Sequence, residues 1–314
     1  MKIKSYESGD EETLEELYGL WKEVAKERPN TVKKDLEEFE EAHLKTSESI
    51  DLQCFTVHEN SKLIGASILK MRPGEANPFL NFLVPKEKLR SEGSKELLER
   101  SIEYCKKEEE LEISLSANIY PQEVIDFFKE QGFEKSEDHP SGVWMKKDLE
   151  DLSESKSPES IDIFGVEDLE GAVSARDLAQ VHLDYSDDDS FELEDHIDEF
   201  EKLDREQDDI LYGIAKLEDS DEVVGFSRTV FVDLLRGDSI AQNVGLVVKE
   251  EHREKGIGGT LLVDSFHRAK ERGYEKMYIS THSKNPAQRL YREVGFELES
   301  EHPNLSYRIE DLEG

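Results

Sequence analysis

The hydrophobic side chains in the first half of the chain follow two alternating kinds of spacing. Apolar residues three and four positions apart, which mark one face of a helix, alternate with segments in which every second residue is apolar, as in a strand. The pattern therefore predicts a domain built from both kinds of element. The predicted strands are 1–6, 54–57, 63–70, 79–84 and 111–116, and the predicted helices are 11–25, 32–43, a helix containing Leu97–Cys105, and 121–131.

The second half of the chain repeats this order of elements, which indicates an internal duplication. Gly132 follows Arg90 by 42 positions (132 − 90), and Gly295 follows Arg253 by the same interval (295 − 253). The predicted elements of this half are strands near 161–163, 244–248 and 276–281, and helices at about 168–182, 260–273 and 286–294.

The length of the chain and one polar segment suggest where the copies divide. A chain of 314 residues is long for one domain and suits two. Residues 149–160 are charged, contain serine and nearly lack large apolar side chains, which is typical of a linker. The sequence predicts a first domain at residues 1–150, a linker at 151–160 and a second domain at 161–314.

Charge narrows the range of partners. The chain has 75 acidic and 40 basic residues and a formal net charge of −35, which would repel the phosphates of a nucleic acid. Acidic residues occur in nearly every predicted helix, which favours a surface adapted to high salt, in the manner of a halophile. Lysine outnumbers arginine and glutamate outnumbers aspartate, however, so attraction of a cationic substrate or a lysine-rich partner remains an open alternative.

The apolar segments are too short to span a membrane, and the first residues do not resemble a signal peptide. We therefore expect a cytoplasmic protein without a membrane partner. Cys54 and Cys105 both lie in apolar patterns, so we expect them to be core residues.

A glycine-rich stretch, Arg253–Gly259, lies between the apolar run Val244–Val248 and the helix that begins at Thr260. A strand, a glycine-rich turn and a helix in this order can bind phosphate. Glycines let the backbone approach an anion, and the start of the helix offers unpaired N–H groups and the positive end of its dipole. Two spaced glycines alone are a weak signal, and their context on both sides strengthens it.

A second pattern follows the loop and consists of Asn285, Ala287, Leu290, Tyr291 and Gly295-Phe296. Together, the loop and this pattern resemble the GNAT family, the Gcn5-related N-acyltransferases. The loop is similar to the family's acyl-CoA pyrophosphate motif, and the resemblance is close from Val244 onward and looser over the first half. It implies a tandem GNAT protein of the α/β class, with two copies of a mixed, mainly antiparallel sheet flanked by helices.

The resemblance implies acetyl-CoA as co-substrate, no metal, and a site in the second copy. Loop N–H groups would hold the pyrophosphate, and the preceding strand would splay from its neighbour so that its backbone could pair with pantetheine amides and stabilise an oxyanion. Tyr291 would protonate the departing thiolate. The alternative interpretation of Tyr291 is a half-buried aromatic residue of a helix, without a catalytic role. The implied cofactor-binding residues are Leu246, Val247, Val248, Arg253, Lys255, Gly256, Ile257, Gly258, Gly259, Thr260 and Asn285, and the implied catalytic residue is Tyr291.

The first copy differs where chemistry would occur. Shifted by 163 positions (253 − 90), the loop of the second copy falls on Arg90, Gly93 and Lys95. Lys95 places a side chain where the loop of the second copy has a glycine, which predicts a catalytically silent first copy. Alternatively, the Lys95 ammonium group could bind a phosphate. The replaced residues are Lys95 for Gly258, Phe128 for Tyr291 and Gln122 for Asn285.

The sequence leaves the general base and the acceptor open. Acceptor specificity should lie within about 178–203, where His182, His196 and the acidic residues at 184 and 187–189 have no spacing typical of metal ligands. We expect His252 to pack and His282, at a strand end, to be the better candidate. The candidate bases near the predicted cleft are Asn243, Asp233, Glu250, His252 and His282.

These observations predict an N-acetyltransferase that transfers the acetyl group of acetyl-CoA to a primary amine of a small molecule or peptide. The amine would attack directly in a ternary complex, and the protein would be a monomer or a homodimer. The alternative is a non-catalytic acyl-CoA-binding or regulatory module. The presence of both Tyr291 and the glycine loop favours the enzyme.

Overall fold

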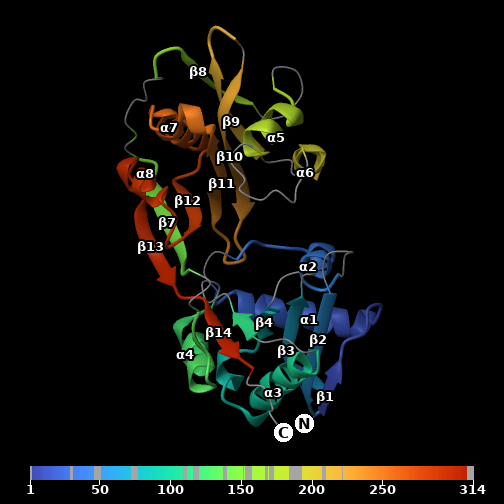
Figure 1. Ribbon diagram of the computed structural model, residues 1–314. Coiled ribbons are helices and arrows are strands. Elements are labelled where there is room, and N and C mark those ends of the chain that lie inside the picture. The colour runs from blue at the N-terminus through green and yellow to red at the C-terminus, as the bar shows by residue number, and fades with distance from the viewer. Residues whose placement is uncertain are drawn as a thin grey trace. The chain divides into compact units, whose positions relative to one another are not determined.

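The computed structural model of the chain comprises two compact units, each with one seven-stranded sheet (Figure 1). Unit 1 consists of Met1–Gly142, Leu234–Gly237 and Glu301–Gly314, and unit 2 of Val143–Asp233 and Asp238–Ser300. The residues that the structure describes are 2–28, 31–45, 51–71, 77–108, 112–115, 120–136, 140–150, 152, 158–166, 169, 173–183, 193–206, 210–220 and 222–309.

The sheet of unit 1 has the order β1-β2-β3-β4-β5-β14-β6. The pair β4–β5 is parallel, and the neighbours β1–β2, β2–β3, β3–β4, β5–β14 and β14–β6 are antiparallel. The strands are β1 (Lys2–Ser5), β2 (Asp51–Glu59), β3 (Lys62–Met71), β4 (Phe79–Leu83), β5 (Glu112–Leu115), β6 (Glu134–Lys135) and β14 (Leu305–Arg308).

Helices cover both faces of this sheet, because its strands alternate apolar side chains between two cores. Cys54 of β2 packs in the core under α1 and α2, whereas its neighbour Phe55 packs with α3 and α4. Cys54 and Cys105 are both buried, which confirms their placement in the core. The helices are α1 (Glu11–Ala25), α2 (Leu36–His43), α3 (Glu92–Lys107) and α4 (Gln122–Glu130).

The sheet of unit 2 has the order β13-β7-β12-β11-β10-β9-β8, and here β11–β12 is the parallel pair. Helices α7 and α8 pack on one face, and α5 and α6 pack on the other. The strands are β7 (Gly142–Asp148), β8 (Ile161–Val166), β9 (Ile210–Leu217), β10 (Val223–Asp233), β11 (Ser239–Val248), β12 (Lys276–His282) and β13 (Glu297–His302). The helices are α5 (Ala175–Leu183), α6 (Leu193–Glu206), α7 (Ile257–Glu271) and α8 (Gln288–Glu293).

If the chain is divided between residues 150 and 161, one strand from each half pairs in the sheet formed mainly by the other half. Strand β7, which precedes residue 150, pairs in the sheet of unit 2, and β14, near the C-terminus, pairs with β5 and β6 of unit 1. Each sheet therefore needs one strand from the other half of the sequence.

One buried contact is repeated in the two units. In unit 1, Ser67 of β3 and Ser101 of α3 have their hydroxyl oxygens 2.8 Å apart, and in unit 2, Ser227 of β10 and Ser265 of α7 have theirs 2.9 Å apart. Both helix serines also donate to the carbonyl four residues earlier. Small side chains at this point let the helix approach the sheet closely, and the repetition supports a duplication.

Two helices begin later than the sequence pattern predicts. The helix predicted from residue 32 begins at Leu36, because Asp35 and Glu38 form a reciprocal capping box. Within the helix predicted at 168–182, the described residues show α5 beginning at Ala175, after a similar exchange of hydrogen bonds between Ser174 and Asp177. Cap residues decided both boundaries, and apolar spacing alone did not reveal them.

Candidate functional site: the splayed strands of unit 2

Strands β11 and β12 run side by side only over their first residues. The last pairs are Gln242 with Tyr278 and Asn243 with Ile279, yet β11 continues to Val248 and β12 to His282. Over 244–248, β11 pairs with β10 alone among the described strands. Backbone groups on the β12 side of this segment therefore have no strand partner among the described residues. The splay predicted for the strand end at Leu246–Val248 is present, and the structure shows that it starts after Asn243.

A bulge in β11 marks the point of divergence. Arg228 of β10 pairs with Gly245 and Thr229 pairs with Asn243, so Val244 has no opposite residue on β10. An extra residue bends its strand and increases the local twist. The bulge thus accounts for the direction in which β11 leaves β12. Leu246 and Val248 beyond it pack toward α7, and Val247 packs toward α5 and α6.

Contacts at the end of β11 hold the loop that follows it. The Arg253 Nε donates to the Val248 carbonyl at 3.0 Å, which fits the ordering role expected for Arg253. Lys249 is mostly buried, and its Nζ lies 2.6 Å from the Glu222 Oε1; this hydrogen bond lowers the pKa of Glu222. The guanidinium of Arg253 and the side chain of Lys255 are exposed, so the loop presents two cations on a strongly acidic chain.

The backbone of the loop opens the start of α7. Gly256 is the N-cap with φ of +83°, and Glu254 is also left-handed with φ of +60°. The first bond of the helix runs from the Thr260 N–H to the Gly256 carbonyl, so the N–H groups of Ile257, Gly258 and Gly259 have no acceptor within the helix. Such groups, with the positive end of the dipole, form a ready anion site.

The glycines of this loop serve two different purposes. A Cβ added at Gly256 would meet nothing within 4 Å, so its hydrogen atom faces open space. A Cβ at Gly258 would lie 3.2 Å from Leu290 Cδ2, and one at Gly259 would lie 3.5 Å from Leu290 Cδ1. Gly256 therefore leaves room for a ligand, and Gly258 lets α7 pack closely against α8, whereas a Cβ at Gly259 would make an ordinary contact.

Tyr291 lies on α8 and is 8% exposed. It packs in the core formed with Leu262, Phe266 and Phe296, and its ring centre lies 6.1 Å from that of Phe296. The turn after α8 supports this position, because the Phe296 N–H donates to the Tyr291 carbonyl at 2.9 Å. Tyr291 thus occupies the same face of the sheet as α7.

Asn285 fixes the turn between β12 and α8. Its Nδ2 donates to the Thr281 Oγ1 at 2.8 Å, and its Oδ1 accepts from the Ala287 N–H at 2.8 Å. Both ends of the amide are thus engaged within the chain. The geometry indicates that Asn285 positions α8, and with it Tyr291.

The candidate bases lie in different surroundings. His282 is exposed at the end of β12, His252 is half-buried, and Glu250 is exposed in the short 3-10 helix after β11. Asp233 lies at the far end of the β10–β11 hairpin, where it accepts from the Ser239 hydroxyl. Asn243 is 5% exposed, and its amide is not a base. His282, at the end of β12 that leaves β11, lies nearest the splay along the strands.

His182 of α5 and His196 of α6 meet across the helix pair, with their Nδ1 atoms 3.3 Å apart. The acidic residues 184 and 187–189 lie outside the described residues. Within the described part of the chain, no three His, Cys, Asp or Glu side chains are grouped so that they could hold a metal ion. Nor does any helix there have the length and apolarity needed to cross a lipid bilayer.

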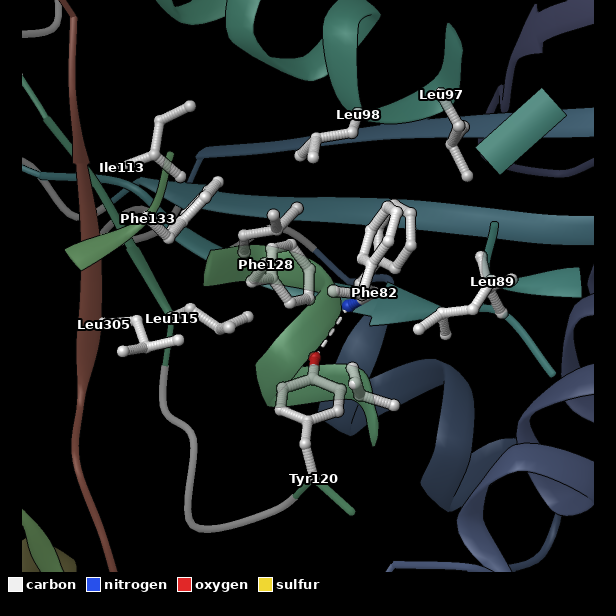
Figure 2. Close-up of a cluster of buried hydrophobic side chains, with 14 of the residues drawn as sticks. Phe82, Leu89, Leu97, Leu98, Ile113, Leu115, Tyr120, Phe128, Phe133 and Leu305 are labelled. Atoms are coloured by element: carbon white, nitrogen blue, oxygen red, sulfur yellow. Dashed lines mark hydrogen bonds between the residues drawn. The ribbon is translucent and has the colours of Figure 1, made fainter. Parts of the chain in front are cut away.

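The corresponding gap of unit 1 is closed by its own side chains. Strand β4 pairs with β5 only at Phe79, but the Phe82 N–H donates to the Tyr120 Oη at 2.7 Å (Figure 2). The Arg28 Nη2 donates to the Phe82 carbonyl at 3.0 Å, and its guanidinium lies 4.5 Å from the centre of the Tyr120 ring. Both backbone groups of Phe82 that face the gap are therefore occupied.

The helix start of unit 1 is closed as well. Ser91 caps α3, and its hydroxyl accepts from the Ser94 N–H. Gly93, placed opposite Gly256 by the shift of 163 positions, is buried in the first turn of the helix and has no positive φ. Lys95 is exposed. Comparing the sequences of the two copies identified Lys95 and Phe128. It missed Ser91, Arg28 and Tyr120, which also distinguish unit 1 from the candidate site of unit 2.

Comparison with known proteins agrees with this geometry. Residues 177–296 match the model of the acetyltransferase (GNAT) family. No curated protein sequence matches the chain significantly. Among solved structures, the chain is similar to a tandem GNAT protein from the clavulanic acid biosynthesis pathway, at 14% identity over 98% of this chain and 99% of that one, with a TM-score of 0.74.

Two further structures show the same likeness. A GCN5-related N-acetyltransferase from Sphaerobacter thermophilus is 14% identical over 98% of this chain and 96% of its own, with a TM-score of 0.67. A GNAT-family acetyltransferase from Colwellia psychrerythraea is 14% identical over 99% and 100%, with a TM-score of 0.62.

The fold of the whole chain is thus that of tandem GNAT proteins, with two mixed sheets flanked by helices. Within the second half, residues 177–296 are similar to the GNAT acetyltransferase family. The resemblance predicted from the glycine loop and the segment around Tyr291 is confirmed.

Proposed function

We propose that unit 2 is an acetyl-CoA-dependent N-acetyltransferase that acts on a primary amine. The observation that carries this proposal is the combination of an open splay after Asn243 with an uncapped helix start at Gly256. The splay offers strand-like backbone partners for an amide-bearing arm, and the helix start offers donors for a diphosphate. Acetyl-CoA contains both groups, joined in that order.

Different segments of unit 2 would bind different parts of acetyl-CoA. The N–H groups from Lys255 to Gly259 would donate to the pyrophosphate, while the Thr260 N–H closes the first turn of α7, Arg253 orders the loop and Gly256 leaves space for the ligand. The β11 backbone at Leu246, Val247 and Val248 would pair with the pantetheine amides. Asn285 contributes by fixing the turn that carries α8.

The bound thioester supplies an activated acetyl group. A backbone N–H of the splayed β11 segment would stabilise the negative charge that develops on the carbonyl oxygen when the amine attacks and the C–N bond forms. Tyr291 would then give its proton to the sulfur as the C–S bond breaks, and the amine would lose its extra proton to a base or to solvent. Direct attack requires both substrates to be bound together.

Unit 1 has a structural role in this proposal. Tyr120 and Arg28 occupy the backbone groups of β4, and Ser91 caps the helix start, so neither part of a CoA site is available there. We expect one acetyl-CoA per chain, a cytoplasmic protein that works as a monomer or homodimer, and an acceptor of small-molecule or peptide chemistry.

Release of CoA in the presence of a panel of amines tests this function. The panel should contain polyamines, amino acids, amino sugars and a peptide with a free N-terminus. Acceptor-dependent release of thiol, together with the mass of the acetylated product, is the expected result. If acetyl-CoA binds but no amine increases thiol release above the rate of hydrolysis, the result supports the alternative function, a non-catalytic acyl-CoA-binding module.

A further inference from the structure

Asn243 is a polar residue at the base of the splay. It is the last residue of β11 that pairs with β12, opposite Ile279, and it directly precedes the bulge at Val244. It is 5% exposed, and its Nδ2 has no hydrogen-bond partner among the described residues. A buried amide donor left without a partner is rare in native proteins and calls for a specific explanation.

The face of the sheet on which Asn243 lies is the face of the proposed chemistry. Its neighbour two residues earlier, Ala241, and its partner across the sheet, Ile279, both belong to the core that contains Tyr291. Strand alternation places Asn243 on that same face. The donor is thus at the vertex from which the two strands diverge, on the side of the general acid.

The Asn243 amide does not form a hydrogen bond with Thr229, the polar residue next to it in the sheet. Thr229, opposite Asn243 on β10, is fully buried, and its Oγ1 also has no partner among the described residues. A purely structural role would be served at least as well by an apolar side chain in this core, because an unpaired buried donor destabilises the folded state. A ligand that accepts a hydrogen bond at the vertex removes that disadvantage.

We propose that the Asn243 Nδ2 donates a hydrogen bond to the carbonyl oxygen of the acyl group, as a side-chain donor beside the backbone donor of β11. This inference rests on the proposed function of unit 2. During attack the carbonyl oxygen gains negative charge as the C–N bond forms, so the bond to Nδ2 strengthens and returns to its initial strength when the C–S bond breaks. Asn243 is then a catalytic residue of the oxyanion site.

The test compares the affinities of three ligands by calorimetry. Acetyl-CoA has the carbonyl, S-ethyl-CoA has the same length without it, and CoA lacks the acyl group. In the wild-type chain we expect acetyl-CoA to bind more tightly than S-ethyl-CoA. In Asn243→Ala this ratio should fall about three- to tenfold, the range of one neutral hydrogen bond, while the affinity for CoA stays unchanged.

Two further variants keep the test decisive. Asn243→Leu retains roughly the size of the side chain and has no hydrogen-bond donor, so the ratio should fall again, and it replaces Asn243→Ala if that variant melts early. Thr229→Val removes the neighbouring hydroxyl from the same core and should leave the ratio unchanged.

An unchanged ratio in both Asn243 variants overturns the proposal. So does an equal loss of affinity for all three ligands, which would show a structural role. Failure of the wild-type chain to bind CoA at all contradicts the proposed function of unit 2, and is thereby distinguished from a failure of the Asn243 assignment.

Discussion

The two units have the same gap between their parallel strands but differ in what occupies it. Among the described residues of unit 2, the β11 backbone beyond Asn243 has no strand partner on its β12 side, whereas in unit 1 Tyr120 and Arg28 bind both backbone groups of Phe82. A cavity beside this gap in unit 1, lined in part by Val84 and Tyr120, measures about 130 Å³, well below the roughly 300 Å³ at which ligand pockets begin. In one fold, a few side chains thus decide whether these strand backbone groups stay open or are occupied.

The occupied gap also explains a buried cation. Arg28 is 6% exposed, and its burial lowers the pKa of the guanidinium, although the group remains protonated throughout the ordinary pH range. The guanidinium is held by the Asn81 Oδ1, the Phe82 carbonyl and the ring of Tyr120. These contacts are what a bound amide-bearing ligand would have to displace. Unit 1 thus fills with its own side chains the backbone positions that unit 2 leaves open.

Fragments of the chain give the largest expected difference between the units. A fragment of residues 161–314 lacks β7, which lies between β13 and β12, and carries β14 without its partners. A fragment of residues 142–302 contains all seven strands of the sheet of unit 2. We expect the first to aggregate and the second to remain monomeric by size-exclusion chromatography with light scattering. Equal behaviour of the two would contradict the strand exchange.

Tyr291→Phe tests the chemistry of the open unit. The change keeps the ring and removes the proton, so kcat should fall at least about tenfold while acetyl-CoA affinity changes little. The measurement is steady-state thiol release under conditions in which chemistry limits the rate. Tyr274→Phe is the matched control, since Tyr274 precedes β12 at the end of the strand remote from the splay. An unchanged kcat would mean that another group or water is the acid.

Tyr120→Phe tests the closed unit. The substitution leaves the Phe82 N–H buried without its acceptor, which should destabilise the chain by about 1–3 kcal/mol. Acetyl-CoA affinity should not change, because the site lies in unit 2. Thermal unfolding and calorimetry measure the two effects, with Tyr104→Phe on α3 as a half-buried control. A loss of acetyl-CoA affinity in folded Tyr120→Phe would place a ligand in the first unit instead.

Salt should affect both units together, because the acidic residues are distributed over both halves of the chain. If the net charge of −35 is an adaptation to salt, its self-repulsion destabilises the fold in dilute buffer and is screened in molar KCl. We therefore expect the melting temperature to rise with KCl. A flat response would favour attraction of a cationic substrate or partner.

Local features of the fold could be predicted from the sequence. Helix α1 has the predicted bounds, and the loop from Arg253 to Thr260 has the predicted order of strand, turn and helix. Such features depend on the spacing of apolar residues and on the positions of glycines that lie within a few residues of one another in the sequence. Even the splay followed from the resemblance of this segment to a known family.

Features that depend on distant partners could not be predicted in this way. Strand β14 has only four residues, and nothing in the residues of β7 or β14 specifies a partner sheet in the other half of the chain. Arg28 looks like a surface residue in sequence, and only the fold brings it to Tyr120, 92 positions later (120 − 28). For Asn243 a signal was available, since this polar residue stands two positions after Ala241 and so on the inward face of its strand.

The stoichiometry of acetyl-CoA binding tests the contrast between an open and a closed unit most directly. Calorimetry on the wild-type chain should give one acetyl-CoA per chain. Gly256→Glu should weaken binding by at least about a hundredfold, because it puts a side chain and a negative charge where the pyrophosphate must lie. Gly273→Glu is the matched control, since Gly273 also has positive φ and open space around it, and it should bind normally. Two sites per chain, or one site that persists in Gly256→Glu, would contradict the account.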